Sequence, residues 1–166
     1  KPIRWMKLED NHYGMNETTL IAKDIIKYMC VDAKEPRNSN SDRRNYGNNR
    51  YIHSNIHQWL NSDKTSWYND AHSSDQAPNK DNVWYGNPYD NILGFMNAWD
   101  RDFKEAILNT SLKVVKSSTD GGGMDTFNAK VFYLSRTEAG LGNESGADGT
   151  PFSYFDSDNR RKAVPT

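Results

Sequence analysis

The pattern of apolar and polar residues predicts short strands and short helices separated by long polar segments. Residues 3–8 alternate between apolar and polar side chains, which is typical of a strand with one buried face. Strands are predicted at residues 3–8, 18–22, 24–31, 112–116 and 131–134. The segment 24–31 is ambiguous, because Ile25, Ile26 and Met29 would also share one face of a helix, but its β-branched and aromatic residues favour a strand.

A helix is predicted to begin after Ser54, whose hydroxyl makes it a favourable N-cap. Ile56, Trp59 and Leu60 follow at a spacing that places their side chains on one helical face. The polar residues 61–63 are expected to end this helix.

Two shorter helices are predicted within residues 92–109, and Asp100 is the expected N-cap of the second. Ser135 and Glu138 have the spacing of a capping box, so a short helical turn is expected there. Mixed short strands and helices without an internal repeat predict an α+β fold, and the length is that of a single domain, residues 1–166.

Residues 32–50 and 67–89 contain few aliphatic side chains and are expected to be long irregular segments. Aromatic residues stand in them among Asn, Asp, Ser and Arg, namely Tyr46, Trp67, Tyr68, Trp84, Tyr85 and Tyr89. Such rings either complete a small core or form a recognition surface, since they supply contact area at low entropic cost. Sugar binding uses the same combination, with rings against the pyranose and Asn or Asp on its hydroxyls. We expect at least one or two of these rings to be exposed.

Composition narrows the classes of partner. Lys and Arg number 21 and Asp and Glu number 22, for a formal net charge of −1, whereas nucleic-acid binding needs a cationic excess. No apolar stretch approaches the ~20 residues of a membrane-spanning helix. Neither nucleic acid nor membrane insertion is therefore expected, and the 12% of aromatic residues indicates a folded chain.

The candidate catalytic and metal-binding patterns are weak. Cys30 lies in an apolar run and is expected to be buried and unreactive, and the sequence contains no Gly-x-Ser-x-Gly motif. His53 and His57 have the spacing of a zinc-binding pair, with His72 as a third candidate, but no Glu adjoins His53 as general base. Residues 156–159 all have side chains with oxygen atoms, which are the ligands that calcium prefers. Calcium is therefore the one cofactor retained as an alternative.

Three pieces of the sequence resemble an uncharacterised bacterial and phage domain family: NYGNNRY at 45–51, SNIHQWLNS at 54–62 and KVFYLSRTE at 130–138. In that family a WLN helix is followed by a DKVFLLS..E segment. The family is similar to the C-type-lectin and formylglycine-generating-enzyme fold, and it recurs in phage tail and bacterial surface proteins, which implies a role in recognition. The enzymatic branch of that fold needs two reactive cysteines, which this sequence lacks. Family members continue beyond residues 152–155 with a further segment. The resemblance therefore implies either that the chain is a fragment or that another polypeptide supplies the final strands.

These observations predict a C-type-lectin-like α+β recognition module, non-enzymatic, on a phage virion or a bacterial cell surface, that binds a cell-surface glycan or protein. The expected ligand-binding residues are Trp67, Tyr68, Asn69, Asp70, Trp84, Tyr85 and Asn87, with no catalytic or metal-binding residue. The alternative is a structural or assembly domain whose sheet is completed by a neighbouring chain or a second copy. A hydrolase of cell-wall sugars is a third hypothesis, which requires two carboxylates that converge in a cleft.

Overall fold

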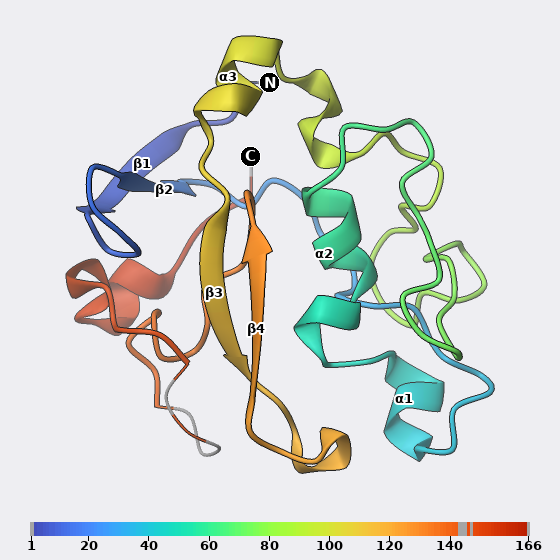
Figure 1. Ribbon diagram of the computed structural model, residues 1–166. Coiled ribbons are helices and arrows are strands. Elements are labelled where there is room, and N and C mark those ends of the chain that lie inside the picture. The colour runs from blue at the N-terminus through green and yellow to red at the C-terminus, as the bar shows by residue number, and fades with distance from the viewer. Residues whose placement is uncertain (1, 143–145, 147, 166) are drawn as a thin grey trace. The chain divides into compact units, whose positions relative to one another are not determined.

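The computed structural model describes residues 2–142, 146 and 148–165, and the chain forms two compact units. The first unit comprises residues 1–27, 110–128 and 133–166, and the second comprises residues 28–109 and 129–132. Short strands and short helices alternate with irregular segments (Figure 1), so the predicted α+β class is confirmed. That the chain is a single lectin-like domain stays a prediction.

The first unit begins with an antiparallel pair, β1 (Trp5–Asp10) and β2 (Thr18–Ala22), which confirms two predicted strands. Asn11 and Asn16 border the connecting turn with φ values of 57° and 62°. Asparagine tolerates this left-handed conformation better than most residues, because its side chain forms local hydrogen bonds. The pairing shifts by one residue between Lys7 and Glu9, which marks a β-bulge.

A second two-stranded sheet consists of β3 (Thr110–Val115) and β4 (Met124–Ala129). The turn between them contains a 3-10 helix, Ser118–Asp120, followed by three glycines with positive φ. Strand β3 confirms the predicted strand at 112–116, whereas β4 was not predicted.

The predicted strand at 131–134 is wrong, because a side chain takes the place of a neighbouring strand there. The Asn61 Oδ1 atom accepts the backbone N–H groups of Lys130 and Val131, at 2.8 and 3.1 Å. Its Nδ2 atom donates to the carbonyl oxygens of Val131 and His57, at 2.8 and 3.0 Å. The backbone at 130–131 is thus hydrogen-bonded to the end of a helix and not to a strand.

The predicted strand at 24–31 is also wrong. Only Ile25 forms a bridge, parallel to Pro165, with its N–H donating to the Val164 carbonyl. Further along this segment, carbonyl oxygens accept hydrogen bonds from Asn87 and Tyr89. These polar groups satisfy the backbone without a sheet.

The second unit contains α1 (Ser41–Tyr46), α2 (Asn55–Leu60), α3 (Arg101–Ala106) and 3-10 helices at Tyr51–His53 and Phe95–Ala98. The Ser54 hydroxyl accepts the His57 N–H, and Asp100 accepts the Phe103 N–H, so both predicted caps are confirmed. Helix α1 was not predicted; its N-cap is Asn40, whose side chain accepts two backbone N–H groups. Residues 32–50 are therefore not irregular throughout.

The C-terminal part of the first unit contains the predicted capping box. The Glu138 carboxylate accepts the Ser135 N–H at 2.8 Å, and the Ser135 hydroxyl accepts the Glu138 N–H at 3.1 Å. Two 3-10 helices follow at Ser153–Phe155 and Asp158–Arg161. In the described part of the chain, no helix is long and apolar enough to cross a membrane.

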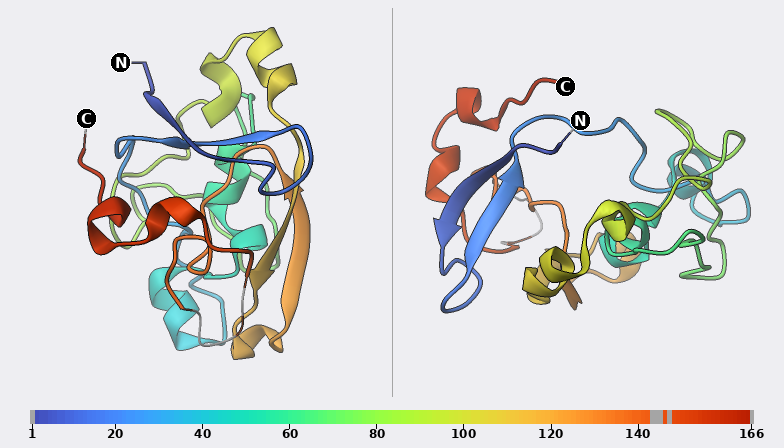
Figure 2. Two further views of the ribbon diagram at one scale, coloured as in Figure 1. Left: turned by 90° about the vertical axis from the view of Figure 1, so that its left-hand side faces the viewer. Right: turned by 90° about the horizontal axis from the view of Figure 1, so that it is seen from above.

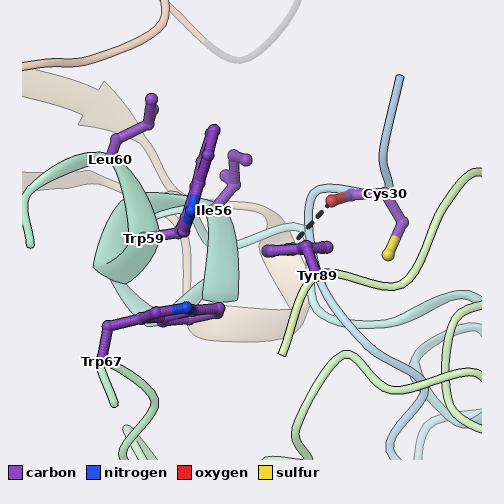
Figure 3. Close-up of a cluster of buried hydrophobic side chains, with 6 residues drawn as sticks. All are labelled: Cys30, Ile56, Trp59, Leu60, Trp67 and Tyr89. Atoms are coloured by element: carbon purple, nitrogen blue, oxygen red, sulfur yellow. Dashed lines mark hydrogen bonds between the residues drawn. The ribbon is translucent and has the colours of Figure 1, made fainter. Parts of the chain in front are cut away.

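The core of the second unit is largely aromatic (Figure 3) and consists of Cys30, Ile56, Trp59, Leu60, Trp67 and Tyr89. The rings of Trp67 and Tyr89 stack with their centroids 5.6 Å apart. Polar atoms on the rings bond to backbone carbonyls, as when the Tyr89 hydroxyl donates to Cys30 at 3.0 Å. The predicted burial of Cys30 is confirmed, and burial raises the pKa of its thiol to about 11, so the reactive thiolate is scarce at neutral pH.

Candidate functional site

The candidate site rests on residues 28–34, here called the frame segment, which lie against residues 82–89. The Lys34 N–H donates to the Asn82 carbonyl at 2.9 Å. At the other end of the frame segment, Asn87 donates to the Tyr28 carbonyl through both its backbone N–H, at 3.2 Å, and its Nδ2 atom, at 3.0 Å. The two segments are therefore joined at both ends.

Further bonds join the frame segment to the core. The Tyr89 hydroxyl donates to the carbonyls of Cys30 and Val31, at 3.0 and 3.3 Å. The Val31 carbonyl also accepts the Ile56 N–H at 3.0 Å, which links the frame segment to the first turn of α2. An irregular backbone is thus anchored through its polar groups.

Two glycines allow neighbouring segments to approach the frame segment closely. Gly86 has a φ of 87°, and a Cβ atom there would lie 2.9 Å from the Met29 Cα. Gly47 has a φ of 88°, and its Cβ would lie 2.6 Å from the Asp32 carbonyl oxygen. Any side chain at either position would force the backbones apart.

An aromatic residue directly precedes each of these glycines, and both belong to a row of exposed rings. The aromatic row consists of Tyr46, Trp84, Tyr85 and Tyr28, in that order, and its residues are between 48% and 61% exposed. Successive ring centroids lie 5.1, 5.3 and 5.2 Å apart. Within the described residues, ring contacts join only successive members, so the rings form an extended row and not a compact cluster.

The row contains part of the predicted site. Trp84 and Tyr85 are exposed, which confirms that some rings of the polar segments reach the surface. Asn87 is exposed beside them, although its amide group is bound to the backbone. Tyr28 was missed, because it stands in an apolar stretch that was interpreted as a strand.

The predicted residues 67–70 form a separate group of contacts. Trp67 is only 2% exposed and stacks on Tyr89, so its ring is not available for a ligand and the expectation for this residue is corrected. The Tyr68 hydroxyl donates to Asp70 at 2.7 Å, and the Asn69 side chain donates to the Trp67 carbonyl at 3.1 Å. These side chains stabilise their own segment.

A buried acidic cluster, formed by Asp32, Glu35 and Asp75, holds the segments that adjoin the frame segment. Asp32 accepts the N–H groups of Asn48 and Asn55, at 2.8 and 2.9 Å. Asp75 accepts the Asn55 side chain at 3.1 Å, and its other oxygen accepts a backbone N–H at 2.8 Å. Sequence reasoning missed this cluster, because acidic residues in a polar segment indicate exposure.

Glu35 completes the cluster through contacts with His72 Nε2 and the Asn38 amide. Burial raises the pKa of Asp32 to about 7 and also raises that of Asp75. All three carboxylates are buried and bonded to groups of the protein. Their role in the structure is therefore to organise loops.

Two of the three candidate metal-binding histidines lie against each other, and the third lies beside a tyrosine. The rings of His53 and His72 stack at 5.1 Å, whereas that of His57 lies 5.2 Å from the ring of Tyr51. Burial lowers the pKa of His57. Among the residues that the structure describes, no group of three or more His, Cys, Asp or Glu side chains is placed to hold a metal ion.

The calcium candidate at residues 156–159 has its carboxylates beside cations. Asp158 pairs with Arg161 at 2.8 Å, and Asp156 lies 3.3 Å from Arg160. Arg161 also donates to the carbonyls of Ala139 and Phe155, at 2.7 Å each. These carboxylates belong to a network that fixes the C-terminal part of the first unit.

The fold and the site define a small α+β protein in which irregular segments and the end of helix α1 present a row of exposed aromatic rings. Residues 16–166 match the family described as Domain of unknown function (DUF6273), and the chain belongs to this family. The expected membership of an uncharacterised domain family is thereby confirmed. No curated protein and no solved structure matches the chain.

Proposed function

We propose that this protein is a non-enzymatic recognition module that binds its partner through the aromatic row. The observation that supports this proposal most directly is the exposure of four rings, each in contact with the next. Aromatic residues contribute most of the binding energy of many interfaces, and contiguous exposed apolar surface marks interaction sites. The same chain buries Trp67 and Tyr89, so its sequence is able to place rings in a core.

The support beneath the row favours binding at low entropic cost. The Trp84–Tyr85 segment is held by the bonds of Asn82 and Asn87 to the frame segment. Tyr46 is the last residue of α1 and directly precedes Gly47, whose backbone lies against the frame segment. Rings that are already positioned lose less conformational freedom when a partner binds.

The proposed setting is a phage tail or a bacterial cell surface, outside the cell, and the proposed architecture is C-type-lectin-like. The resemblance of residues 45–51, 54–62 and 130–138 to bacterial and phage domains supports this setting. The partner would be a cell-surface glycan or a surface protein. Neither a metal nor another cofactor is part of the proposal.

Attachment to bacterial cells tests the proposal. Fluorescently labelled protein is incubated with a panel of intact Gram-positive and Gram-negative cells and with isolated cell walls, and bound protein is measured by flow cytometry or sedimentation. We expect Trp84→Ala and Tyr85→Ala to weaken attachment without altering the circular dichroism spectrum. Phe103→Ala is the matched control, since Phe103 is a partly exposed ring outside the row. Unchanged attachment of the row variants would remove the row from the binding site.

A structural or assembly domain is the second candidate. Each sheet in the described part of the chain has only two strands, and the edges of such sheets pair readily with other strands. Light scattering over a range of protein concentrations distinguishes the two. A stable monomer favours the recognition module, whereas association that persists on dilution favours assembly.

A further inference from the structure

We propose that the aromatic row binds an extended, uncharged oligosaccharide and contacts several consecutive sugar units. This inference rests on the proposed function, because it names the ligand of the same surface. Four features of the row support it: its length, the contacts between its rings, its free hydroxyl groups and the charges around it.

The length of the row favours a ligand of several units. Successive centroids are 5.1 to 5.3 Å apart, which is close to the length of one pyranose unit in a linear chain. Within the described residues, Tyr46 and Tyr28 at the two ends make no ring contact with each other. A single sugar would therefore cover only part of the row.

The contacts between the rings argue against a proline-rich peptide, the other ligand that aromatic surfaces commonly bind. Proline-rich helices dock into grooves that are lined by aromatic side chains. Here Trp84 and Tyr85 stack on each other, and the two outer pairs meet edge to face. Neighbouring rings already touch, so a proline cannot enter between them. The outer surface of the row remains for a ligand that lies along it.

Polar groups on the row match sugar hydroxyls. Within the described residues, the hydroxyls of Tyr28, Tyr46 and Tyr85 make no hydrogen bond, and all three residues are exposed. A tyrosine hydroxyl both donates and accepts, as does a sugar hydroxyl. The exposed Asn87 adds a side-chain carbonyl oxygen next to Tyr28.

The charges near the row indicate an uncharged ligand. Within the second unit, the exposed cations Arg44 and Lys80 are accompanied along the chain by the exposed anions Asp42 and Asp81. Arg44 already donates to two backbone carbonyls. The surroundings of the row therefore lack the excess of one sign that would select a charged polymer.

Calorimetry with sugars of graded length tests the proposal. The probes are cello-oligosaccharides and N-acetyl-chito-oligosaccharides of one to six units, with oligogalacturonides and a proline decamer as charged and peptide comparisons. We expect affinity for at least one uncharged series to rise with length and then level off. Trp84→Ala should weaken binding of all lengths by roughly tenfold, the loss typical of an aromatic anchor. Tyr28→Ala and Tyr46→Ala should weaken binding of long oligosaccharides but not of the disaccharide.

Phe103→Ala again serves as the control. Phe103 lies on α3, whereas Tyr46 of the row lies on α1. These two helices are at opposite ends of the second unit in Figure 1 and in the left view of Figure 2. The affinity of this control variant for every probe should equal that of the wild type. Stronger binding of the charged or peptide probe, or affinity that is independent of length, would overturn the proposal. The proposal would also be overturned if neither uncharged series bound while Trp84→Ala still weakened cell attachment. That result would leave the proposed recognition function standing. Only attachment that is insensitive to the row variants contradicts both.

Discussion

Asn61→Ala is expected to destabilise the protein by about 2–4 kcal/mol, because one side chain joins helix α2 to residues 130–131. The amide group of Asn61 accepts two backbone N–H groups and donates to two backbone carbonyls, with distances between 2.8 and 3.1 Å. Each such bond contributes about 1 kcal/mol net, and water can reach this half-buried site to replace some of them. The expected loss of stability therefore lies in the lower part of the range obtained by adding the contributions of the four hydrogen bonds.

Urea unfolding followed by tryptophan fluorescence measures this loss, because Trp59 and Trp67 lie in the core. Asn61→Asp keeps the oxygen that accepts the two N–H groups, but it turns a second, charged oxygen toward the carbonyls of Val131 and His57. It should therefore not recover the stability that the alanine variant loses. Asn69→Ala is a control on an exposed asparagine with a single side-chain bond, and its cost should stay below about 1 kcal/mol. Hydrogen exchange adds a local readout, with faster exchange expected at Lys130 and Val131. A loss below about 1 kcal/mol with both amides still protected would refute the reasoning.

Three further predictions concern pH, a partly buried arginine and a glycine. Burial raises the pKa of Asp32 to about 7, so the folded protein keeps a proton that the unfolded chain releases near pH ~4. The unfolding free energy that this group contributes therefore decreases as pH rises between these values. The urea midpoint of the wild type should fall between about pH 5 and about pH 8, and Asp32→Asn should make this fall smaller. An unchanged fall would contradict the assignment. Arg161→Ala should lower the free energy of unfolding by about 2 kcal/mol in thermal or urea unfolding, since the Arg161 guanidinium donates to three backbone carbonyls. Arg160 belongs to an exposed ion pair, so Arg160→Ala should cost under about 0.5 kcal/mol. Equal losses in the two variants would exclude this explanation. Gly86→Ala should cost more than Gly121→Ala, because both have positive φ but only Gly86 faces neighbouring backbone; similar unfolding midpoints for the two variants would show that the close approach is unimportant.

Local signals predicted the helix termini well. The caps at Ser54 and Asp100 and the capping box of Ser135 with Glu138 depend on groups only three residues apart, so the sequence contains the whole interaction. Strands β1 and β2 were found for a similar reason, since alternation and a short turn are local as well.

The wrong strands depend on residues far away in the sequence. The apolar run at 131–134 has high strand propensity, but the backbone N–H of its first residue, Val131, donates to the side chain of Asn61, 70 residues away. In the segment 24–31, Asn87 binds the Tyr28 carbonyl from a separation of 59 residues. Propensity describes how well a residue suits a strand and says nothing about which group will satisfy its backbone.

The site could be predicted only in part. Trp67 and Trp84 stand in similar polar sequence, yet one is buried and the other exposed. The indole N–H of Trp67 donates to the Ile92 carbonyl and its ring stacks on Tyr89, and both partners lie more than twenty residues away. Neighbouring residues therefore indicated that rings would reach the surface, but not which ones.

The two pieces of sequence that contain WLN and KVF are in direct contact, since Asn61, the asparagine of WLN, binds Lys130 and Val131 of the second piece. The ring-bearing segments, in contrast, are positioned through glycines and main-chain atoms. We therefore expect replacement of an indole or a phenol in the row to leave its scaffold intact. Under the proposed recognition function, a combinatorial library restricted to these four positions is a practical route to altered specificity with the same architecture.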